Sequence, residues 1–220
     1  LARIGEVYQI SGRLTERSGQ PVAGLNVIAS SGHISTTTAS GYYTLTVPAG
    51  TYTITPSAGL FWTQSSRTVT VPPDVGGQDF VGTHIRKQVT PGSNVSAAYG
   101  SLLTYTIGLT RTAYGYHLFY DAVPSYTAYV TGSLSTNVWG LGYNAAANAI
   151  SSTVFLHESE PATATFAVRV MMTGTVEAAP LIVNRACLRA TGSDLSGFEW
   201  SNETISFTYV WPLYLPLVTR

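Results

Sequence analysis

The chain has 220 residues, enough for two ordinary domains, and 45% of them are hydrophobic, enough to build a core. Only 10% of the residues are charged, against about 25% in an average globular protein, and the 11 basic and 11 acidic side chains leave no formal net charge. This balance argues against nucleic acid and against a polybasic membrane surface as partners, because both need clustered positive charge.

The first third of the chain alternates apolar side chains with threonines. Residues 43–47 show this period, and it recurs in residues 51–55 and 68–71. Residues 79–81 look like a last strand, and turns rich in glycine and proline separate the runs. A period of two is typical of strands with one buried face and one wet face, as in antiparallel sandwiches.

Turn and strand motifs follow one another in a fixed order in this part. A Gly-x-Pro-Val-x-Gly turn spans residues 19–24, Gly41-Tyr42 precedes the next strand, and residues 48–52 read Pro-Ala-Gly-Thr-Tyr. With these motifs the first domain resembles the carboxypeptidase-regulatory-like and Cna-B-like family of small sandwiches. The turns also have a physical reading, since Gly24 and Gly41 supply backbone freedom there.

Some members of this group carry an amide crosslink between a lysine and an asparagine. Lys87 is the only lysine in the chain. It lies at the inferred domain boundary, outside the first strand, so we expect no such crosslink in the first domain.

A polar and basic stretch at residues 84–88 marks this boundary, and a fresh turn at residues 91–93 precedes a new series of strands. We therefore predict two domains, residues 1–86 and residues 87–220. In the second domain, residues 104–110, 164–170 and 205–211 alternate with a period of two. The predicted fold class is all-β, with two tandem Ig-like antiparallel β-sandwich domains.

Two local features of the second domain leave alternatives open. Residues 143–149 come nearest to a short turn of helix, and no run of apolar residues is long enough for a transmembrane span. Cys187 is the only cysteine, so it is either a buried thiol or an exposed residue that bridges two chains.

The second domain also carries a resemblance, on residues 105–109, 120–124, 129–133, 166–170 and 182–186. On these it resembles the conserved-repeat domain, long labelled a domain of unknown function, of bacterial surface proteins. Residues 110–113 replace the Asn-x-Gly turn of that family. The tail at residues 214–220 is similar to the closing motif of exported surface proteins of filamentous bacteria. Together these resemblances imply an extracellular or cell-surface location.

No motif nominates a reactive centre. His157-Glu158 begins like a zinc-protease motif, but Pro161 stands where the second histidine belongs, so a polar hairpin is favoured. Residues 74–79 lack the dense acidic spacing of a calcium loop, and a surface turn is favoured there. Nucleophile elbows and phosphate-binding loops are absent from the sequence. We therefore expect no catalytic residue, no metal site and no cofactor, and the chain is not predicted to be an enzyme.

Sugars are the most credible small ligands, because exposed aromatic rings stack on them. Trp62 and Trp139 are the candidates, with the alternative that each covers a sandwich end or a domain interface. Asn94 and Asn202 begin N-glycosylation sequons, Asn94-Val95-Ser96 and Asn202-Glu203-Thr204.

These features favour an extracellular structural protein, a subunit of a cell-surface layer or filament. The alternative is an adhesin or a carbohydrate-binding surface module. The expected partners are further copies of the chain, other cell-surface proteins and glycans. Assembly could proceed by strand addition, in which an extended end pairs with an open sheet edge of a neighbour, or each end caps its own domain. The candidate donors are the N-terminal segment with Ile4 and Val7 and the apolar tail with Trp211, Leu213, Leu215 and Leu217.

Overall fold

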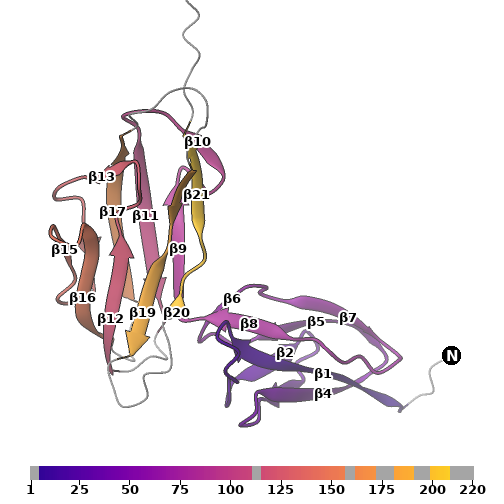
Figure 1. The fold of residues 1–220 in the computed structure, drawn as a ribbon. Coiled ribbons are helices and arrows are strands. Elements are labelled where there is room, and N and C mark those ends of the chain that lie inside the picture. The colour runs from indigo at the N-terminus through magenta and orange to yellow at the C-terminus, as the bar shows by residue number, and fades with distance from the viewer. Residues whose placement is uncertain (1–4, 111–114, 157–161, 172–180, 191–198, 209–220) are drawn as a thin grey trace, which may run out of the picture. The chain divides into compact units, whose positions relative to one another are not determined.

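The computed structural model describes residues 5–110, 115–156, 162–171, 181–190 and 199–208, and these ranges are the described residues. The chain divides into two compact units, Leu1–His84 and Ile85–Arg220. All regular elements of the described residues are β-strands (Figure 1), which confirms the predicted fold class. In the same residues there is no helix that is long and apolar enough to span a membrane.

The first unit consists of two sheets that enclose one core. Its strands are β1 (Val7–Glu16), β2 (Asn26–Ala29), β3 (Ile34–Thr36), β4 (Tyr42–Pro48), β5 (Gly50–Pro56), β6 (Phe61–Trp62), β7 (Arg67–Val71) and β8 (Phe80–Thr83). One sheet has the order β4-β1-β8-β6 and the other has the order β3-β2-β5-β7. Inward side chains of both sheets, among them Ile10, Leu45 and Ile54, form the core. The predicted strands at residues 43–47, 51–55 and 68–71 lie in β4, β5 and β7 and are confirmed.

Two glycines allow close backbone contacts in this unit. A Cβ on Gly12 would lie 2.3 Å from the backbone oxygen of Gln78, so only glycine lets the segment around Gln78 pass beside β1. The Tyr43 hydroxyl donates a hydrogen bond of 2.6 Å to that same oxygen. Gly41 has a φ of +79° at the turn before β4, as predicted from the sequence.

The second unit is built from three sheets around a larger core. Its strands are β9 (Ile85–Thr90), β10 (Val95–Ala97), β11 (Leu102–Leu109), β12 (Gly115–Ala122), β13 (Thr127–Tyr129), β14 (Ser135–Thr136), β15 (Gly142–Asn144), β16 (Ala149–Leu156), β17 (Ala162–Val170), β18 (Leu181–Asn184), β19 (Ala186–Ala190), β20 (Glu199–Trp200) and β21 (Thr204–Thr208). The orders are β13-β17-β11-β9, with β14 also on β17, then β15-β16-β12-β19-β20, and β10-β21-β18. Figure 1 shows β17, β11 and β9 in one layer and β16, β12 and β19 in the layer that faces it.

The strands β18 and β19 follow each other along the chain and connect two sheets. Asn184 ends β18, which pairs with β21, and Ala186 begins β19, which pairs with β12. Arg185 alone separates the two strands. This run therefore carries the chain directly from one sheet into another.

The predicted turn of helix at residues 143–149 is wrong. This segment forms the end of β15, a turn, and the start of β16. The Asn144 side chain accepts hydrogen bonds from the backbone N–H groups of Ala146 and Ala147, at 3.1 and 3.2 Å. Such a local bond offers the backbone an alternative to a helix, and Asn148 then takes a φ of +46°.

Candidate functional site

The only lysine of the chain lies inside the core of the second unit. Lys87 is 1% exposed, and on β9 it shares the inward face with Ile85 and Val89, while Arg86 points outward. Residues 84–88 were predicted to mark the domain boundary, and the division between the two units falls between His84 and Ile85. Residues 85–88 begin the first strand of the second unit, and one side of this strand packs on the core.

Lys87 is paired with Asp121 of β12, from the facing layer. Its Nζ donates a short hydrogen bond to Oδ2 of Asp121, and both side chains are fully buried. The Nζ atom also lies 4.5 Å from the ring centre of Tyr105 and 5.3 Å from that of Phe166. The lysine end of the ion pair therefore lies against two aromatic rings, and both charged groups are shielded from solvent.

Burial changes the proton affinity of both partners. Desolvation lowers the pKa of Lys87 to about 8, although Asp121 opposes this shift. Desolvation raises the pKa of Asp121 to about 6, although Lys87 opposes it. Because a dry site disfavours both charges, the free-energy gap between the ion pair and the neutral amine with the neutral acid is narrower than it is in water.

Asn184 of β18 completes the cluster. It is 4% exposed, and its side chain lies close enough to Asp121 and to Tyr105 to lower the pKa of both. Yet Nδ2 of Asn184 and Oδ1 of Asp121 form no hydrogen bond of ordinary geometry with the described residues. Buried polar atoms without partners are rare in proteins, so the cluster holds groups that are close together but not yet satisfied.

A second asparagine fixes the backbone of the lysine. The Asn202 side chain accepts a hydrogen bond from the Lys87 N–H at 2.9 Å and donates one to the Lys87 carbonyl at 2.8 Å. Ser201 is fully buried, and its hydroxyl accepts a hydrogen bond of 3.1 Å from the N–H of Ala186. The loop before β21 thus connects β9 to β19 at the position of the cluster.

The cluster brings together an amine, a carboxyl group and a primary carboxamide in an apolar site. These are the reactants of an amide exchange, in which an amine displaces ammonia from a carboxamide. The carboxyl group can carry the protons that such an exchange must move.

This cluster was not predicted from the sequence. A signal was present, because Lys87, Asp121 and Asn184 all occupy inward positions of alternating strands. The residues around Asp121 and Asn184 were identified as strands, but only as carriers of a resemblance. Their proximity depends on how the layers face each other, which the alternation does not encode.

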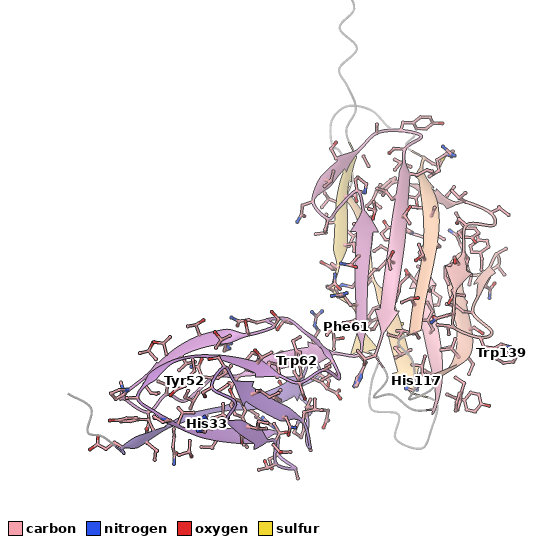
Figure 2. The ribbon with its side chains drawn as sticks, turned by 180° about the vertical axis from the view of Figure 1, so that it is seen from behind. His33, Tyr52, Phe61, Trp62, His117 and Trp139 are labelled. Atoms are coloured by element: carbon pink, nitrogen blue, oxygen red, sulfur yellow. The ribbon has the colours of Figure 1, made fainter. Side chains whose placement is uncertain are left out.

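The two tryptophans proposed for sugar stacking lie in different units and differ in exposure. Trp62 packs edge-on against Phe80, with ring centres 6.4 Å apart, and its Nε1 donates to the Ser57 carbonyl. Trp139 is 85% exposed, and Figure 2 shows it at the margin of the second unit. Only Trp139 presents a ring that is open to a ligand.

The two sequon asparagines also differ. Asn94 is exposed, with a φ of +62° in the turn before β10. Asn202 is half-buried, and the nitrogen that would carry a glycan is the one that donates to Lys87. A glycan would compete with this bond, so the geometry favours Asn94 over Asn202 as an acceptor.

Most of the candidate strand donors lie outside the described residues, namely Ile4, Trp211, Leu213, Leu215 and Leu217. Val7 is 59% exposed and pairs with Pro48 of β4, so from Val7 onward β1 belongs to its own sheet. Strand donation stays a prediction.

The remaining candidates are explained by local structure. Asp74 and Asp79 accept hydrogen bonds of 2.8 Å from the backbone N–H groups of Gln9 and Arg13. Within the ranges that the structure describes, no three histidine, cysteine or acidic side chains gather as a metal site. The segment His157–Pro161 lies outside those ranges. Cys187 is buried, and burial raises the pKa of its thiol to about 11, which favours an inert thiol over an interchain bridge.

Solved structures show a likeness in fold. The major pilin subunit BcpA of Bacillus cereus is 12% identical, with a TM-score of 0.47 over 92% of this chain and 69% of that chain. The major pilin SpaD of Corynebacterium diphtheriae is 12% identical, with a TM-score of 0.43 over 94% and 68%. The collagen adhesin CNA of S. aureus is 10% identical, with a TM-score of 0.37 over 92% and 76%.

Comparison with known sequences bears on the first unit. No protein of curated function matches this chain. Residues 9–81 match the family described as carboxypeptidase regulatory-like domain, which confirms this part of the resemblance for most of the first unit.

Proposed function

We propose that the chain is a structural module of the cell surface whose second unit closes itself with a covalent bond. The bond is an amide between Nζ of Lys87 and Cγ of Asn184. The observation that carries the proposal is the buried Lys87–Asp121 pair with the carboxamide of Asn184 beside it. The reaction occurs once in each chain and has no external substrate, so the prediction that the chain is not an enzyme is unaffected.

The reaction begins with a proton transfer from Lys87 to Asp121 along their hydrogen bond. The neutral Nζ then adds to Cγ of Asn184, and one new C–N bond forms. The bond from Cγ to Nδ2 breaks, and Nδ2 leaves as ammonia after it receives a proton from Asp121. Asp121 then takes the second proton of Nζ, so a neutral amide and a neutral carboxyl group remain. No electrons are gained or lost, so the exchange needs no oxidant, reductant or cofactor.

The environment favours each step of this reaction. Only the neutral amine is a nucleophile, and desolvation lowers the pKa of Lys87 toward neutrality. The raised pKa of Asp121 suits a group that accepts a proton and later returns it. The strands hold the reactants together, which removes the entropic cost of bringing them into contact.

The position of the bond fits a structural role. Lys87 lies in the first strand of the second unit, and Asn184 lies roughly 100 residues later along the chain. Closing a loop of that length restricts the unfolded chain strongly. A force that pulls on β9 would then act on a covalent bond and not only on hydrogen bonds.

Intact-mass spectrometry of the purified chain tests the proposal. We expect a mass below that of the sequence by one ammonia molecule. Cleavage after arginine should then release residues 87–111 and 170–185 as one branched peptide. A branch to Asn202 instead, or the full sequence mass in a folded chain, would contradict the proposal.

Three variants sharpen this test. Lys87→Met and Asn184→Ala should both keep the full sequence mass. Asn184→Asp should lose water in place of ammonia and reach the same final mass as the crosslinked chain. Asn144→Ala, at an exposed asparagine of the same unit, is the matched control and should crosslink normally.

We further propose that this module serves outside the cell as a subunit of a layer or filament. The sequence resemblances to surface proteins support this role, and strand addition by either chain end is a route of assembly. Deleting residues 211–220 and measuring assembly by sedimentation tests the tail as a donor. Unchanged assembly would exclude it.

A sugar-binding role is the second candidate, and the exposed ring of Trp139 favours it. Screening the chain and Trp139→Ala against a glycan array tests this role. Trp62→Ala is a poor probe, because that ring packs on Phe80 in the first unit. Equal glycan binding by both proteins would exclude Trp139 as the platform.

A further inference from the structure

One buried group of the second unit has no role in the steps above. The Tyr105 side chain is fully buried, and its hydroxyl forms no hydrogen bond of ordinary geometry with the part of the chain that the structure describes. A buried hydroxyl without a partner costs free energy comparable to that of a lost hydrogen bond. A phenylalanine would fill the same space without this cost, so the hydroxyl calls for an explanation.

The surroundings of this hydroxyl point to the reacting amide. Tyr105 lies on β11, and its ring is within 4.5 Å of Nζ of Lys87 and 5.4 Å of the ring of Phe166, centre to centre. The side chains of Asn184 and Thr204 lie close enough to the hydroxyl to change its pKa. The hydroxyl therefore lies beside the electrophile, while the ring lies beside the nucleophile.

The ionisation of Tyr105 is compatible with a donor role. Desolvation is the largest influence on its pKa, and with the nearby charge of Asp121 it raises that pKa above the ordinary value. The hydroxyl thus keeps its proton at neutral pH. A protonated, unengaged hydroxyl in a dry site is a ready hydrogen-bond donor.

We infer that Tyr105 is a catalytic residue in the formation of the amide bond between Lys87 and Asn184. Its hydroxyl donates a hydrogen bond to the side-chain oxygen of Asn184 when Nζ of Lys87 adds to Cγ. The inference rests on the proposed function. Negative charge develops on this oxygen only as the new bond forms. A donor that is unsatisfied before the reaction and satisfied in the transition state lowers the barrier, because it adds nothing to the stability of the starting state.

The test compares Tyr105→Phe with the unchanged chain. Both chains are dissolved from inclusion bodies in denaturant and refolded by dilution. Samples are quenched with acid at intervals, and the mass of the chain is measured by mass spectrometry. Phenylalanine keeps the ring beside Lys87 and removes only the hydroxyl. We expect the loss of ammonia to slow by about a hundredfold or more, as when one oxyanion donor is removed from an enzyme. Tyr120→Phe, on the exposed face beside Asp121, should react at the unchanged rate.

A stability measurement separates catalysis from folding. In the Lys87→Met background, which cannot crosslink, Tyr105→Phe should leave the melting temperature of the second unit unchanged or raise it. An unchanged rate in Tyr105→Phe would overturn the inference while leaving the proposed function intact. A slower rate with a lower melting temperature would assign Tyr105 a structural role and also overturn it. If the unchanged chain loses no ammonia, the proposed function itself fails.

Discussion

In the first unit, the buried hydroxyl groups of Tyr43 and Tyr52 donate to the carbonyls of Gln78 and Pro48, at 2.6 and 2.8 Å. The second unit has the same fold class, but several of its buried polar groups have no such hydrogen-bond partner in the described ranges. Among the described residues, four buried side-chain polar atoms lack a hydrogen bond, and all of them belong to the second unit. They are Tyr105 Oη, Asp121 Oδ1, Asn184 Nδ2 and Ser206 Oγ.

The difference shows where chemistry is to be sought in a fold without an evident active site. An unsatisfied buried group lowers stability, so a sandwich built only for rigidity would replace it with an apolar one. The first unit follows this rule. The second unit departs from it, and three of the four unsatisfied atoms among its described residues lie in the cluster around the only lysine of the chain. The proposed amide bond removes the buried charges of this cluster.

The largest effect is expected from Asp121→Ala. This change prevents the crosslink and leaves the Lys87 charge buried without its partner, at a cost of about 3–5 kcal/mol on top of the lost bond. Because burial lowers the pKa of Lys87, the unfolded chain binds more protons there, and stability should rise from pH 6 to pH 9. Hydrogen exchange resolved by peptide measures the second unit separately.

The double variant Lys87→Met with Asp121→Leu is the control for that experiment. It removes both charges and should recover part of the stability lost in Asp121→Ala, without crosslinking. An Asp121→Ala chain that is as stable as this double variant at pH 6 would show that the lysine charge is not buried.

Lys87→Met should have the next largest effect. Loss of a crosslink around a loop of roughly 100 residues removes about 4–5 kcal/mol. Its pH dependence should have the opposite sign to that of Asp121→Ala. Burial raises the pKa of Asp121, so the folded chain binds more protons there, and stability should fall as pH rises from 5 to 8. Calorimetry should show only the second unit melting earlier, and Gln88→Met, on the exposed face of β9, should change little.

Asn202→Ala should have a moderate effect. It removes the two hydrogen bonds to the Lys87 backbone and should cost about 1–3 kcal/mol in the uncrosslinked Lys87→Met background. With Lys87 present, the loss of ammonia should also slow, since Nζ is held less firmly. Ser96→Ala removes the other sequon at an exposed position and should leave both quantities unchanged. An unchanged rate in Asn202→Ala would show that Asn202 does not position Lys87.

Tyr43→Phe tests the first unit with the same chemical change as Tyr105→Phe. It removes a satisfied hydrogen bond and leaves the Gln78 carbonyl without this donor, so the first unit should lose about 1 kcal/mol. Tyr105→Phe should lose nothing in the uncrosslinked second unit. Denaturant unfolding of both variants measures the contrast, and equal losses would remove the distinction drawn between the units.

The sequence predicted the fold well where each strand has one wet face. Threonines alternate with apolar residues in β4 and β5, and this period identified both strands. Gly41 was expected at a turn, and its positive φ is what that turn requires. Residues 143–149 were misassigned because the Asn144 side chain, and not the run of alanines, determines the local backbone.

The site was harder to predict, for a physical reason. Lys87 and Arg86 adjoin each other, and two adjacent basic residues are typical of a solvated linker. Yet in a strand, neighbours point to opposite faces, so Arg86 is exposed while Lys87 is buried. Even with that correction, β9 pairs with β11, and Asp121 lies on β12 in the facing layer. Such proximity is set by packing between layers, which the period of a single strand does not contain.

The smallest expected effect is at Glu16 of the first unit. Its carboxylate lies 3.2 Å from Nε2 of His84, and this hydrogen bond is the main reason that the pKa of Glu16 lies below its ordinary value. A lowered pKa in the folded state stabilises the protein above the ordinary value near 4.5, and this contribution is lost as pH falls through the folded pKa. Glu16→Gln should therefore cost less than about 1 kcal/mol at pH 6 and nothing at strongly acid pH, measured by denaturant unfolding. Glu6→Gln makes the same change at an exposed carboxylate and is the control; a pH-independent cost at Glu16 would show that packing, not charge, is what His84 supplies.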